Sequence, residues 1–66
     1  MAPGEAIERL RHRDDYLVSR IAEFTAQGKP VFWFTQDREA IALAISAIEY
    51  LDQVQQYEQS QTQTTD

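Results

Sequence analysis

The sequence predicts a mainly α-helical protein: a helix, a short extended or β segment and a second helix. The two helices form an antiparallel pair that dimerises into an assembly resembling a four-helix bundle. Two stretches carry apolar residues at helical spacing, which favours paired helices. The chain has only 66 residues and no cysteine, so a single copy buries little surface and has no disulfide to support it. A second copy of the chain is therefore expected.

The first helix is expected over residues 4–27. Its apolar residues fall in one stripe about 120° wide on a helical wheel. Gly28 is suited to ending the helix because glycine adopts a left-handed backbone without steric cost, and Pro30 prevents the helix from continuing. The stripe consists of Ile7, Leu10, Leu17, Val18, Ile21 and Phe24.

Asp14 lies inside this stripe, between Leu10 and Leu17. An unpaired carboxylate in an apolar contact is costly. We expect either that Arg11 or an arginine of a partner chain pairs with Asp14, or that the helices separate at this level and leave it exposed.

Residues 30–34 are expected to be extended, because Val31, Phe32, Trp33 and Phe34 are β-branched or aromatic and follow a proline. No second strand is evident in the sequence. The segment would therefore pair with its copy in a second chain, or pack as a loop beneath the helices.

The second helix is expected over residues 36–58, with Thr35 as its N-cap and two acidic residues, Asp37 and Glu39, in its first turn. Its apolar residues span about 240° of the wheel, twice the width of the first stripe. One lobe of this arc contains Ile41, Ile45 and Ile48; the other contains Leu43, Tyr50, Val54 and Tyr57, with Leu51 beside it. Small residues lie between the lobes: Ala40, Ala44 and Ala47. This helix should meet two neighbours, of which the chain supplies one.

Residues 1–59 are expected to form one domain, and residues 60–66 a disordered polar tail, since nothing apolar remains there to bury. The net charge is −5, which argues against bulk binding to nucleic acid. No apolar stretch approaches the roughly 20 residues of a membrane span, and no signal peptide is evident. A cytoplasmic protein without membrane contact is expected.

No catalytic, cofactor-binding or metal-binding residue is expected. His12, the single histidine, shares a helix face with Glu8 and Asp15, but that face points away from the apolar stripe. Such spacing is typical of solvated helix-stabilising pairs. The chain also lacks the glycine-rich loops and nucleophile turns of common enzymes.

The sequence therefore predicts a small, non-enzymatic homodimer that acts by binding another macromolecule, preferably a protein, with a possible regulatory role. One alternative is a nucleic-acid-binding regulator that uses Arg9, Arg11 and Arg13 of each protomer. Another is an acidic inhibitor that mimics nucleic acid, since residues 34–66 carry most of the negative charge. The expected dimer or partner interface comprises Phe32, Trp33, Phe34, Ile41, Ala44, Ile45, Ile48 and Leu51.

Overall fold

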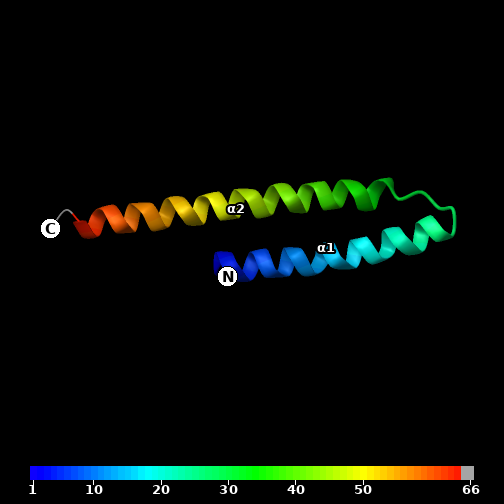
Figure 1. Ribbon diagram of the computed structural model, residues 1–66, viewed down its shortest axis with the longest axis horizontal. Helices are drawn as coiled ribbons and strands as arrows, with labels where there is room; N and C mark the ends of the chain where they lie inside the picture. The colour runs from blue at the N-terminus through cyan, green and yellow to red at the C-terminus, as the bar shows by residue number, and fades with distance from the viewer. Residues whose placement is uncertain (65–66) are drawn as a thin grey trace.

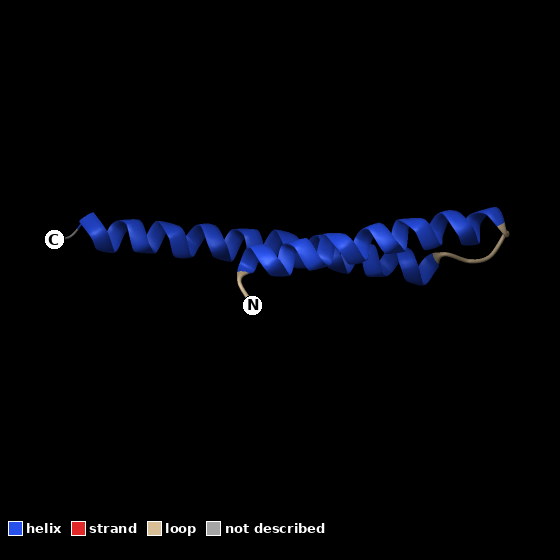
Figure 2. Cartoon of the chain, turned by 90° about the horizontal axis from the view of Figure 1, so that it is seen from below, coloured by secondary structure: helices blue, strands red, loops and turns tan. Residues whose placement is uncertain are grey.

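The protein is a helical hairpin (Figures 1 and 2). The computed structural model describes the backbone of residues 1–64 and the side chains of residues 1–59. Helix α1 spans Pro3–Ala26 and helix α2 spans Phe32–Thr64. The two helices pack against each other in antiparallel directions, and the described part of the chain contains no strand.

Both ends of α1 follow from local sequence. Pro3 occupies the first turn, where its missing N–H is not needed by the helix. At the other end Gly28 has φ of 70°, the left-handed conformation expected of a glycine cap. The amides of Gly28 and Lys29 donate to the carbonyls of Thr25 (3.1 Å) and Phe24 (2.9 Å). Together with the bond from the Gln27 amide to the Phe24 carbonyl (3.1 Å), these bonds satisfy carbonyls at the helix end.

The prediction of an extended segment at residues 30–34 is wrong for residues 32–34, because α2 begins at Phe32 and not at Gln36. Val31, not Thr35, is the residue that precedes the helix: its carbonyl accepts a hydrogen bond from the Thr35 amide (3.0 Å) and another from Thr35 Oγ1 (3.2 Å). A lone strand would leave backbone groups unpaired, whereas a helix pairs them within the segment. This local pairing outweighs the strand preference of aromatic residues.

The far end of α2 also differs from expectation. The helix continues to Thr64, past the predicted end at residue 58 and into the tail predicted to be disordered, and residues 65–66 lie outside the described residues. In Figure 1 the orange and red part of α2 extends well past the N-terminus of α1. The C-terminal part of α2 therefore has no α1 beside it.

The contact between the helices is narrow. Leu17, with 1% of its surface exposed, is the one buried side chain among the residues whose side chains are described. Near the turn, the rings of Phe24 and Phe34 meet edge to face, with their centroids 5.0 Å apart. The charged ends of Arg20 and Lys29 lie over the Phe24 ring, 4.9 and 5.4 Å from its centroid. The rest of the contact is half-buried.

The hairpin is long and thin, with extents of 63 × 16 × 13 Å. Its radius of gyration is 17.2 Å, whereas a compact domain of this length has about 11 Å. Two helices side by side have no third element to close over them, so most of each helix surface stays exposed.

Candidate functional site

The residues predicted to form an interface divide between two faces of α2. One face contacts α1: Phe34 packs on Phe24, and Arg38 pairs with Asp14. Ile41 and Ile45 border a hollow shared with Arg11 and Asp14 of α1. Ala44 and Ile48 of α2 are also half-buried. This inner face of α2 is therefore occupied within the chain.

The opposite face of α2 is open. Large apolar side chains project from it, with Trp33, Leu43 and Tyr50 exposing 70%, 73% and 66% of their surface. Phe32, Leu51 and Tyr57 are also exposed. The described structure therefore shows an uncovered apolar surface along most of α2.

Residues on this open face recur at alternating intervals of three and four, the spacing at which one helix packs against another. We call this set the outer seam: Trp33, Gln36, Ala40, Leu43, Ala47, Tyr50, Val54 and Tyr57. It contains no charged residue, and every member except the half-buried Val54 is exposed. The open face thus has the pattern of a helix-packing surface.

Asp14 is paired within the chain. Arg38 of α2 donates from Nε to Oδ1 at 2.8 Å and from Nη2 to Oδ2 at 3.2 Å. The Asp14 side chain is 26% exposed, so the pair lies at the edge of the helix contact. The Arg38 hydrogen bonds, together with its positive charge, lower the pKa of Asp14, and Asp14 in turn raises the pKa of Arg38. Within the chain Arg38 takes the place expected of Arg11, so that part of the expectation is wrong.

The predicted basic cluster is split by the helix. Arg11 turns toward α2 and meets Glu49, with Nη2 and Oε1 3.5 Å apart. Arg9 and Arg13 lie on another side of α1.

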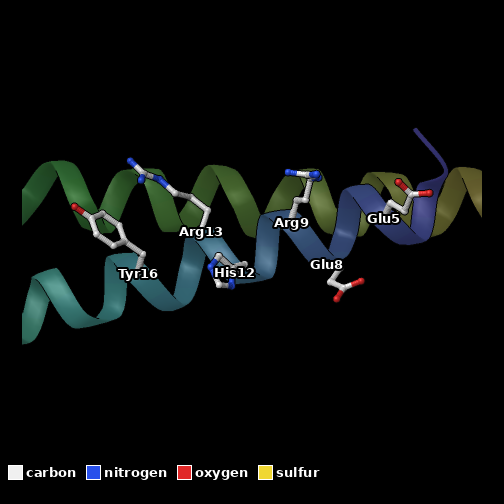
Figure 3. Close-up of a pocket in the computed structure, with 6 residues that line it drawn as sticks. All are labelled: Glu5, Glu8, Arg9, His12, Arg13 and Tyr16. Carbon is white, nitrogen blue, oxygen red and sulfur yellow. The ribbon is translucent and has the colours of Figure 1, made fainter.

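Arg9 and Arg13 line a groove on the outer side of α1 together with two carboxylates. Its six lining residues all come from this helix, and Figure 3 shows them spread along it and not gathered round one point: Glu5, Glu8, Arg9, His12, Arg13 and Tyr16. The Arg13 guanidinium lies over the Tyr16 ring, 4.8 Å from its centroid. Because two carboxylates offset the charges of the two arginines, this groove is not a positively charged surface.

Within the described residues, no group of three or more acidic, histidine or cysteine side chains is placed to hold a metal ion. Neither helix, over the same part of the chain, is long and apolar enough to cross a membrane.

Sequence reasoning identified both lobes of α2 but assigned the isoleucine lobe to the interface. It missed Leu43 and Tyr50 as the exposed lobe and Arg38 as the partner of Asp14. The sequence did contain a signal for the partner of Asp14. An antiparallel pair places Asp14 opposite the N-terminal half of α2, and Arg38 is the one basic residue of that helix. For the exposed lobe no such signal was available, because both lobes contain large apolar residues that can pack against α1.

Comparison of the chain with protein-family models, with curated proteins and with solved structures finds no match.

Proposed function

We propose that the protein is a non-enzymatic homodimer that acts by binding another protein. The observation that supports this proposal most directly is the distribution of exposed surface. Among residues 1–59 one leucine is buried, while three outer-seam residues, Trp33, Leu43 and Tyr50, expose 66% or more of their area. Contiguous apolar surfaces of this kind are typical of interaction sites.

Energetics support the same conclusion. Full burial of one leucine side chain contributes about 1.5–3 kcal/mol. Ordering each residue of a helix costs about 1–2 kcal/mol of conformational entropy before backbone hydrogen bonding and packing offset it. A hairpin in which Leu17 is the single buried side chain among the described ones therefore needs additional packing, and a second copy of the chain would supply it without any other component.

A binding role also agrees with the shape of the surface. The groove on α1 is lined from one helix only, so it does not surround a small molecule as a substrate pocket does. The nucleic-acid alternative has less support, because Glu49 engages Arg11, and Glu5 and Glu8 share the groove with the other two arginines. We also propose a cytoplasmic location, with which a cysteine-free chain is compatible.

Sedimentation equilibrium at micromolar concentration tests the homodimer. We expect twice the 7.6 kDa chain mass. The variant Leu43→Glu places a charge on the outer seam and should give the chain mass, whereas Ala22→Glu, at an exposed position of α1, should remain dimeric. A wild-type protein that sediments at the chain mass would refute the homodimer.

A second measurement tests the binding role. The tagged homodimer is incubated with an extract of its source cells and cross-linked, and captured proteins and nucleic acids are analysed separately. We expect enrichment of a protein that survives nuclease treatment. Enrichment of nucleic acid that Arg9→Glu with Arg13→Glu abolishes would favour the alternative function.

A further inference from the structure

We infer that two copies of the chain associate through the outer seam with their α2 helices antiparallel, in a register that places Leu43 of each copy against Ala47 of the other. This inference rests on the proposed homodimer and specifies the surface, direction and register of its interface.

The exposed area is sufficient for such an interface. The chain exposes 5488 Å², whereas a compact monomer of 7.6 kDa exposes about 4300 Å². The difference of about 1200 Å² exceeds the roughly 800 Å² that each partner buries in a standard protein interface. One continuous helix face can provide most of this area, because the outer seam extends over residues 33–57 of α2.

Residue sizes along the seam favour the antiparallel direction. Small and large residues alternate: Ala40, Leu43, Ala47 and Tyr50. In a parallel pair each layer contains two identical residues, so thin alanine layers alternate with thick layers of leucine or tyrosine. In the antiparallel pair Ala40 lies opposite Tyr50 of the second copy, and Leu43 lies opposite its Ala47. Every central layer then joins one small and one large side chain, which keeps the packing density even.

The register follows from the overlap of the two outer seams and from the charged residues beside them. Setting Leu43 against Ala47 also sets Trp33 of one copy against Tyr57 of the other, so the whole seam is covered. At the flanks, Asp37 then lies beside Leu51 and Glu39 beside Gln53 of the second copy. A shift by seven residues in one direction places Asp37 beside Glu58 of the second copy, where two negative charges repel. A shift in the other direction leaves Val54 without a seam residue opposite.

The arrangement also provides a neighbour for the part of α2 that extends past α1 (Figure 1). Tyr50 and Val54 of one copy face the N-terminal part of α2 of the second copy. The four helices then form a row in which the two α2 helices are central, since the outer seam lies on the far side of α2 from the residues that contact α1.

Disulfide formation tests this register, and the cysteine-free chain makes single-cysteine variants unambiguous. In the inferred dimer Gln36 lies opposite Val54 of the second copy. Two copies of Val54 are separated by about 27 Å along the helix axis, and the same holds for Gln36. A disulfide needs Cα atoms within about 7 Å. Gln36→Cys and Val54→Cys should therefore form no disulfide alone. After unfolding together, refolding and mild oxidation, the mixture should give the mixed disulfide.

Each outcome separates the inference from the proposed function. Disulfides in each variant alone would show parallel helices and overturn the inference. A dimeric mass without a disulfide in the mixture would show another face or register, overturning the inference while the homodimer stands. A wild-type protein at the chain mass would overturn both. If either variant no longer dimerises, Ala40→Cys with Tyr50→Cys repeats the test one layer nearer the two-fold axis, with the same expected result.

Discussion

The ion pair between Asp14 and Arg38 should make the stability of the hairpin depend on pH. The arginine lowers the pKa of Asp14 in the folded state below its ordinary value of 3.8. The folded state therefore binds fewer protons than the unfolded state near this pH. The stabilisation is present above the ordinary pKa and is lost as the pH falls through the lowered value.

Asp14→Asn tests this dependence by thermal unfolding followed with circular dichroism. The variant should unfold at a lower temperature than wild type at pH 7 and lose less stability between about pH 5 and pH 2. Asp15→Asn is the matched control, because Asp15 is the exposed neighbour outside the Arg38 hydrogen bonds. Equal pH profiles for wild type and Asp14→Asn would show that the pair does not stabilise the fold.

Leu17 is the centre of the contact between α1 and α2, so its truncation should be severe. Leu17→Ala removes a side chain that is 1% exposed and should lower the free energy of unfolding by about 2–5 kcal/mol. Urea unfolding measures the loss. Val18→Ala deletes methyl groups from the adjacent, exposed position and should change stability by less than about 1 kcal/mol. Similar losses in the two variants would show that the contact is not centred on Leu17.

Among the elements, the turn between the helices depends on one glycine. Gly28 has φ of 70°, which a residue with a Cβ adopts at a cost of about 1–2 kcal/mol. Gly28→Ala should destabilise the hairpin by this amount. Gly4→Ala is the control with the opposite sign: Gly4 lies in the first turn of α1 with open space around it, and alanine there should be neutral or stabilise by up to about 1 kcal/mol. Chemical denaturation measures the free energy of unfolding of both variants. A stabilising Gly28→Ala would contradict the role assigned to the left-handed turn.

How far the helices could be predicted depends on the kind of signal each segment carries. The mainly helical character followed from the 3.6-residue periodicity around Leu10, Leu17 and Phe24, which local chemistry alone determines. The start of α2 could not be predicted from such a local pattern. Trp33 and Phe34 prefer strands in general, but the strand preference of aromatic residues reflects packing against other strands. With no strand among the described residues, the aromatic segment forms the first turn of a helix.

The candidate site, like the helices, could be predicted only in part. A wheel shows that α2 is too widely apolar for one neighbour, and that conclusion agrees with the exposed side chains of Leu43 and Tyr50. Which lobe meets α1 depends on the rotation of α2 about its axis, and contacts with α1 fix that rotation. Phe34 against Phe24 and Arg38 against Asp14 are such contacts, and they involve residues distant in sequence. Periodicity within one helix contains no information about them.

At the scale of the whole molecule, folding and association should be a single process. One side chain among residues 1–59 is buried and the radius of gyration is 17.2 Å, so we expect the proposed second copy to supply further apolar burial. When a folded dimer is in equilibrium with unfolded chains, mass action stabilises the dimer as the protein concentration rises. A hairpin that folds alone shows no such dependence.

Thermal unfolding at several protein concentrations distinguishes these cases. We expect the midpoint to rise by roughly 3–6 °C for each tenfold increase in concentration, the shift that about 1.4 kcal/mol produces in an assembly of this size. Leu43→Glu should abolish the concentration dependence, since it removes association through the outer seam, whereas Ala22→Glu should keep it. A wild-type midpoint that stays constant across a hundredfold range would show that the hairpin is stable as a monomer. The exposed face of α2 would then have to be explained by a different partner.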